Sequence, residues 1–88
     1  MKVLVIYRSN SEHGRKVEEF MYDFKRRYPL DKLEAVGVDT RDGSALASLY
    51  DIVSYPGIVV LREDGTPSMI WQGEALPLID EVAGYALN

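Results

Sequence analysis

The sequence predicts one α/β domain, residues 1–88, in which a mixed four-stranded sheet carries about three helices on its two faces. The expected order is strand, helix, strand, helix, strand, strand, helix. Two observations lead to this prediction. In the first half, a segment of helical periodicity connects two apolar runs of strand length, which implies that those strands pair in parallel. In the second half, Asp64 and Gly65 form a tight-turn signal, which implies an antiparallel pair.

The first strand and the helix that follows it have the clearest patterns. Lys2 to Tyr7 is a continuous apolar run with β-branched members, typical of a strand buried on both faces. Ser9 and Glu12 have the spacing of a capping box, so the helix is expected to begin near residues 10–12. Its apolar residues recur at intervals of three and four and predict a buried stripe: Val17, Phe20, Met21, Phe24 and Tyr28.

The polar side of this helix carries charges of both signs. Asp23 and Arg27 stand four residues apart, so they are expected to form an ion pair along the helix. Pro29 is expected to end the helix, because the residue before a proline avoids helical geometry.

The second strand is expected at Leu33 to Val38, and the charged segment Asp39 to Gly43 reads as a loop into a short helix. Four residues are expected to form the buried side of that helix: Ala45, Leu46, Leu49 and Tyr50.

The second half of the chain adds a hairpin and a last helix. The hairpin strands are expected at Ile58 to Leu61 and Ser68 to Gln72, with Met69 and Trp71 on one face and Ile70 on the other. The last helix is expected from Leu76 to Ala86, with Pro77 in its first turn. Its residues available for burial are Leu78, Ile79, Val82 and Ala83.

Composition limits the function. The net charge of −4 argues against nucleic acid, whose phosphates require clustered lysine and arginine. No apolar run approaches the length of a membrane span or a signal-peptide core, so a cytoplasmic location is expected, with no membrane partner. The carboxylates form no spaced cluster of metal ligands, and Asp39 and Asp42 are expected to serve turn and cap geometry. We expect neither a metal nor a cofactor.

The stretch from Tyr50 to Gly73 resembles the second half of the thioredoxin and glutaredoxin fold. The resemblance lies in the spacing of Tyr50, Ile52 and Pro56, and in the turn glycine Gly65 followed eight residues later by Gly73. It implies a compact thioredoxin-like domain of three layers, glutaredoxin-sized. It also implies a cis peptide bond before Pro56, with the backbone amide and carbonyl of Tyr55 facing an extended peptide or glutathione.

The redox motif of that family is missing. The resemblance places the two thiols of a CxxC motif between the first strand and the first helix. Counting back from the helix stripe puts them at Ser11 and Gly14, whereas counting forward from Tyr7 puts them at Glu12 and Arg15. The chain contains no cysteine, so thiol–disulfide exchange and cysteine peroxidase chemistry are excluded.

Several side chains remain candidates for a site. The backbone amides of Ser11 to Gly14 would favour an anion, although Glu12 would repel one, and the serine would otherwise only cap the helix. His13 is either a candidate base without an acid partner or a surface residue. Tyr55 and Trp71 would flank the groove beside Pro56, with Trp71 equally suited to the core.

The leading hypothesis is a non-redox domain that binds a protein or peptide. The groove would be formed by Ser11, Glu12, His13, Gly14, Tyr55, Pro56 and Trp71. One alternative is an enzyme or carrier that binds glutathione or another small anion without a cysteine. Another is a structural subunit, including a homodimer, that associates through an edge strand. The sequence leaves the partner and the oligomeric state open.

Overall fold

The computed structural model describes residues 2–8 and 11–86, and its elements follow the predicted order. One sheet with strand order β2-β1-β3-β4 contains β1 (Lys2–Tyr7), β2 (Lys32–Gly37), β3 (Gly57–Leu61) and β4 (Pro67–Gln72). β1 pairs in parallel with β2 and antiparallel with β3, and β3 pairs antiparallel with β4. The predicted mixed sheet is therefore confirmed.

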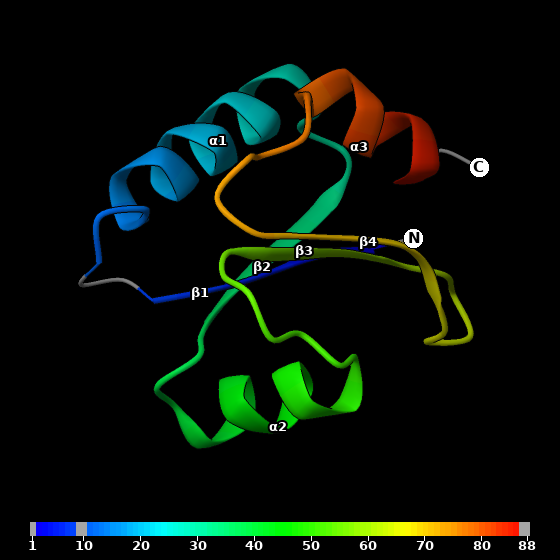
Figure 1. The fold of residues 1–88 in the computed structure, drawn as a ribbon. Helices are drawn as coiled ribbons and strands as arrows, with labels where there is room; N and C mark the ends of the chain where they lie inside the picture. The colour runs from blue at the N-terminus through cyan, green and yellow to red at the C-terminus, as the bar shows by residue number, and fades with distance from the viewer. Residues whose placement is uncertain (1, 9–10, 87–88) are drawn as a thin grey trace.

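Three helices complete a three-layer arrangement. Helices α1 (Gly14–Arg27) and α3 (Ile79–Ala86) cover one face of the sheet, and α2 (Arg41–Leu49) covers the other (Figure 1). The two central strands, β1 and β3, are buried on both faces, and Val3, Val5 and Ile6 of β1 are fully inaccessible to solvent. This agrees with the continuous apolar run that predicts a doubly covered strand.

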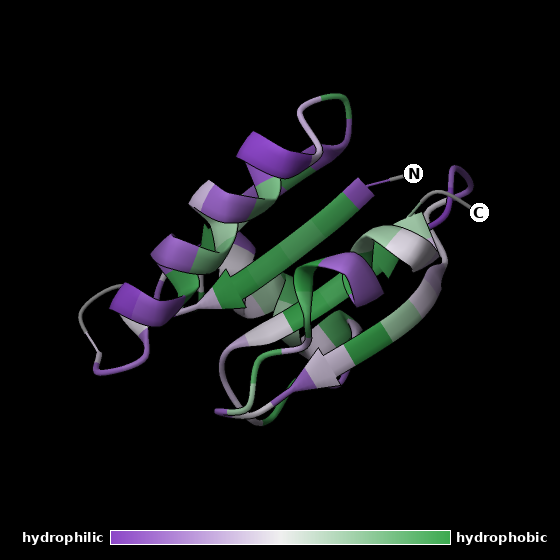
Figure 2. Ribbon diagram, turned by 90° about the horizontal axis from the view of Figure 1, so that it is seen from above, coloured by the Kyte–Doolittle hydropathy of each residue, from purple (hydrophilic) through white to green (hydrophobic). Residues whose placement is uncertain are grey.

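The sheet separates two apolar clusters. The larger one lies under α1 and α3 and is built around Val3, Val5, Val17, Phe20, Phe24, Ile58, Val60, Val82, Ala83 and Ala86. The smaller one lies under α2 and consists of Leu4, Ile6, Ala47, Ile52 and Val59. Figure 2 shows the apolar strand β1 beneath α1, whose outward surface is polar. The predicted stripe of α1 is confirmed, with Val17, Phe20 and Phe24 buried.

Helix α1 begins later than the sequence predicts. Its first residue is Gly14, and His13 occupies the N-cap position without a side-chain cap hydrogen bond. The predicted start near residues 10–12 is wrong because the amide of Gly14 donates to the carbonyl of Ser11 at 3.1 Å, which makes residues 11–13 a turn. The proposed capping box involves Ser9, which lies outside the described residues.

Helix α2 begins earlier than expected and buries a different side. It starts at Arg41 because the Thr40 hydroxyl accepts a hydrogen bond from the amide of Gly43 at 3.0 Å, which caps the helix. Gly43 and Ala47 are buried, whereas the predicted Ala45 and Leu49 are exposed. The glycine lets this side of the helix approach the end of β2 closely, and Leu49, two residues after Ala47, lies on the opposite side of the helix.

Helix α3 is shorter than predicted. It begins at Ile79, so Leu76 and Pro77 belong to the connection from β4, and Leu78 is 76% exposed instead of buried. Val82 and Ala83 are buried as predicted.

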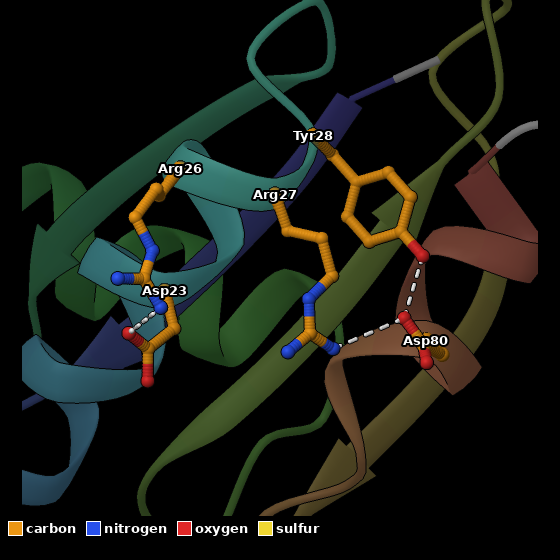
Figure 3. Close-up of polar contacts among 5 residues, drawn as sticks. All are labelled: Asp23, Arg26, Arg27, Tyr28 and Asp80. Atoms are coloured by element: carbon orange, nitrogen blue, oxygen red, sulfur yellow. Dashed lines mark hydrogen bonds and ion pairs between the residues drawn. The ribbon is translucent and has the colours of Figure 1, made fainter.

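A polar contact ties the end of α1 to the start of α3. Tyr28 donates its hydroxyl to Asp80 Oδ1 at 2.6 Å, and Arg27 donates to the same oxygen at 3.3 Å (Figure 3). The tyrosine hydrogen bond and the arginine lower the pKa of Asp80, and the bond to Asp80 raises the pKa of Tyr28. The predicted pairing of Arg27 with Asp23 is wrong, because Asp23 pairs with Arg26 at 3.5 Å.

Candidate functional site

Three chain segments meet at the end of the sheet where β1 finishes. The register of Ile6 with Gly57 places the end of β1 beside Pro56, and the amide of Gly73 donates to the carbonyl of Pro56 at 3.1 Å. The Tyr55–Pro56 peptide bond is cis, and the side chain of Pro56 is fully buried. The segments that enter β3 and leave β4 are thereby fixed next to the β1–α1 loop (Figure 1).

The loop before Pro56 is held by a side chain from β4. Gln72 Oε1 accepts two backbone hydrogen bonds, from Val53 at 2.9 Å and from Ser54 at 3.1 Å. Tyr55 follows directly, and its backbone amide and carbonyl have no hydrogen-bond partner among residues 2–8 and 11–86. A donor and an acceptor are therefore presented side by side on a segment that Gln72 anchors.

The structure thus adds Gln72 to the candidate residues. The sequence contained one signal for it, since strand alternation places Gln72 on the same face of β4 as Ile70, toward α2. The irregular loop that it contacts has no periodicity, so the two hydrogen bonds are visible only in the folded chain.

The β1–α1 loop closes on itself through the residues expected to bind a ligand. Ser11 donates its hydroxyl to the carbonyl of Arg8 at 2.6 Å, and the amide of Arg8 donates to His13 Nε2 at 3.2 Å. The imidazole is therefore an acceptor at Nε2, which assigns its proton to Nδ1. Ser11 neither caps the helix nor has its hydroxyl hydrogen directed at a ligand. Both side chains instead bond to the backbone of Arg8, which holds residues 11–13 close to the end of β1.

A hollow of about 520 Å³ lies between this loop and the segment after β4. It is lined by Ser11, Glu12, His13, Lys16 and Glu74. Two carboxylates from separate segments face one ammonium group there. None of the three forms an ion pair with another described residue. The hollow therefore has a negative balance of charge, which opposes the attraction of the helix N-terminus for an anion.

The structure brings together some of the predicted site residues and separates others. Ser11, Glu12 and His13 share one hollow, but neither aromatic lines it. The Tyr55 ring packs on the α2 face, and its hydroxyl donates to the carbonyl of Ile52 at 3.4 Å. Trp71 packs on the opposite face, with its ring 5.5 Å from that of Tyr85 on α3. The two aromatic side chains therefore do not form the walls of one groove, and the partly buried Trp71 packs against the core.

The fold is thioredoxin-like by comparison with solved structures. Oxidised thioredoxin O2 from Arabidopsis thaliana superposes with a TM-score of 0.71 at 12% identity, over 94% of this chain and 69% of that one. The oxidised thioredoxin from Plasmodium falciparum gives 0.68 at 15% identity, over 97% and 82% of the two chains. The reduced C-terminal domain of DsbD from Neisseria meningitidis gives 0.67 at 18% identity, over 99% and 79%.

The similarity to known proteins is confined to the fold. No protein-family model and no curated protein matches the sequence. The chain has no cysteine, so the thioredoxin-like scaffold is present without its thiols. Across residues 2–8 and 11–86, no helix is long and apolar enough to span a membrane.

Proposed function

We propose that this chain is a non-redox thioredoxin-like domain that binds an extended segment of a protein partner at the end of the sheet beside Pro56. The observation that supports the proposal is the unpaired amide and carbonyl of Tyr55, held in place through Gln72. An extended peptide offers the same two groups in alternation and pairs with such a segment as one strand pairs with another. This recognition uses backbone groups, so it requires no thiol.

The charges around the hollow favour a peptide with a basic residue. Glu12 and Glu74 would attract a lysine or arginine side chain next to the paired segment. The remaining cation, Lys16, reduces this attraction without reversing its sign. A partner segment of this kind would combine backbone pairing at Tyr55 with charge complementarity in the hollow.

The alternative of a small anion, such as glutathione, has one observation in its favour. The first-turn amides of Arg15 and Lys16 have no acceptor among the described residues, and both side chains are basic. The two carboxylates of the hollow and the occupied hydroxyl hydrogen of Ser11 count against it. An NMR titration with millimolar glutathione distinguishes the anion-binding alternative from the peptide-binding proposal, since an anion site requires shifts at residues 11–16.

A random peptide library displayed on phage supplies the test of the leading proposal. Peptides selected on the immobilised protein are expected to shift the amide resonances of residues 53–55 and 57 in ¹⁵N-labelled protein. Gln72→Leu removes the acceptor that anchors the loop and is expected to weaken binding, whereas Gln72→Glu keeps an acceptor in the same place. Selected peptides that leave residues 53–55 and 57 unshifted, or that bind Gln72→Leu as well as the natural protein, would refute the proposal.

A further inference from the structure

The outer edge of β4 has unpaired backbone groups and no charged side chain. In an antiparallel pair, hydrogen-bonded residue pairs alternate with pairs that are not hydrogen-bonded. The amide of Gly73 donates to the carbonyl of Pro56, so the register makes Trp71 and Met69 the residues of β4 whose backbone groups bond to β3. The amides and carbonyls of Ile70 and Gln72 consequently point away from the sheet. No described residue bonds to them, and Figure 2 shows no described segment beyond β4.

Sheet edges of this kind normally carry protection against pairing with another chain. β2, the opposite edge, carries Lys32 and Glu34, and the glutamate forms an ion pair with Lys2. β4 has only Pro67 at its first position, and the rest of the strand is uncharged and largely apolar. The two edges therefore differ, and β4 is the one suited to accept another strand.

A hollow of about 370 Å³ adjoins this edge on the α2 face. Its walls are largely apolar and include Leu49, Tyr50, Pro67 and Ile70, with Leu49 68% exposed. A strand laid along β4 would extend over this hollow. Its residue opposite Ile70 would place a side chain on the same face, because directly opposed residues of an antiparallel pair share a face.

Asp51 is the one charged residue in the lining of this hollow. It follows α2 with a φ of 55°, a left-handed conformation that favours glycine, and its carboxylate stands at the negative end of the helix dipole. It forms no ion pair with another residue of the described chain. An apolar hollow with a carboxylate at one end complements a lysine or arginine, whose aliphatic stem packs while its charged group reaches the acid.

We propose that β4 and this hollow bind an extended, basic segment of another protein, added antiparallel to β4, with a lysine or arginine directed to Asp51. A second copy of this chain complements the edge less well. In an antiparallel pair of β4 strands centred on Ile70, the copy's Glu74 would lie near Thr66, which lines the hollow together with Asp51. The like charges would repel each other.

A capped peptide of alternating lysine and valine is the probe. Its lysines are expected to lie opposite Ile70 and Gln72, so the lysine amides donate to β4 and the valine amides point outward. N-methylation of the lysine amides is therefore expected to abolish binding, and N-methylation of the valine amides to preserve it. The two modified peptides have equal charge, which separates strand pairing from general attraction to an acidic protein.

The readout is an NMR titration of the ¹⁵N-labelled protein. We expect shifts at residues 49–53 and at Ile70 and Gln72. Asp51→Asn is expected to weaken binding about 1.5- to 5-fold, as for an exposed ion pair, while Glu18→Gln on α1 removes the same charge elsewhere and leaves affinity unchanged.

The proposal would be overturned by equal binding of both methylated peptides, by equal affinity of Asp51→Asn and Glu18→Gln, or by shifts confined to the β1–α1 loop. A dimer in light scattering that the peptide cannot dissociate would assign the edge to a second copy and would also overturn it. The outcome is separable from that of the proposed function, because neither Asp51 nor Glu18 bonds to Gln72 or lines the hollow beside the β1–α1 loop.

Discussion

Replacement of Gly43 by alanine should destabilise the protein strongly, although alanine is the better helix former. Gly43 is buried in the first turn of α2, where a Cβ atom would stand 1.7 Å from the carbonyl oxygen of Gly37 at the end of β2. The obstacle is backbone, so no change of rotamer relieves it. Helix α2 would have to move away from β2, and the hydrogen bond from Gly43 to Thr40 would be lost with it.

The magnitude follows from three contributions. Overpacking costs about 1–3 kcal/mol, with the upper end appropriate for a backbone obstacle. Loss of the Thr40 cap costs about 0.5–2 kcal/mol. The higher helix propensity of alanine returns about 1 kcal/mol. The sum is a loss of about 2.5–4 kcal/mol, a large part of the roughly 4–13 kcal/mol expected for 88 residues.

Urea unfolding followed by circular dichroism measures this change, and α3 supplies the control. A Cβ atom at Gly84 would meet no neighbour within 4 Å, so Gly84→Ala is expected to gain up to about 1 kcal/mol. The two substitutions are chemically identical and should have opposite signs. A Gly43→Ala protein as stable as the natural chain would show that α2 does not approach β2 this closely.

Three further substitutions test other contacts. Gln72→Leu should lose about 1–2 kcal/mol with its two hydrogen bonds, which Gln72→Glu retains; equal urea midpoints for the two would contradict the anchoring of the loop. Asp51→Gly should gain about 0.5–1 kcal/mol by relieving the positive φ, and a loss on urea unfolding would count against that backbone conformation. Tyr28→Phe should destabilise near neutral pH, with Tyr22→Phe, 67% exposed, as its control. Asp80, with its pKa lowered from 3.8, contributes stability above that value that is lost as pH falls through the folded pKa. Tyr28, with its pKa raised from 10.0, contributes stability that is lost as pH rises through the folded value. The stability difference between Tyr28→Phe and the natural chain should thus shrink at both extremes, and a difference independent of pH would contradict this contact.

The fold was predictable because it rests on local patterns. The apolar run of β1, the stripe of α1 and the turn at Asp64 and Gly65 each identify one element, and their order leaves few ways to arrange the sheet. The observed turn agrees, since the amide and hydroxyl of Thr66 both donate to the carboxylate of Asp64.

Features that depend on distant contacts were not predictable in this way. Arg27 has an acid four residues away on its own helix, yet it pairs with Asp80, which only the packing of α3 beside α1 brings near. The separation of Tyr55 from Trp71 has a related cause. Strand alternation fixes the face of Trp71, but Tyr55 lies in a loop without periodicity, so its face depends on how Gln72 holds that loop.

Electrostatics connect the two proposed surfaces. Glu12 and Glu74 line the hollow between the β1–α1 loop and the segment after β4, and Asp51 lines the hollow beside β4, in a chain of net charge −4. In each case the adjacent unpaired groups belong to the backbone, which binds any extended chain without regard to sequence. Selectivity must then come from the carboxylates, so basic segments are the class that both surfaces favour. Because the carboxylates are near the surface, added salt should weaken this selectivity more than it weakens the backbone pairing. A basic peptide and its uncharged analogue should consequently approach equal affinity at high ionic strength, whereas a persistent difference would require side-chain recognition beyond charge.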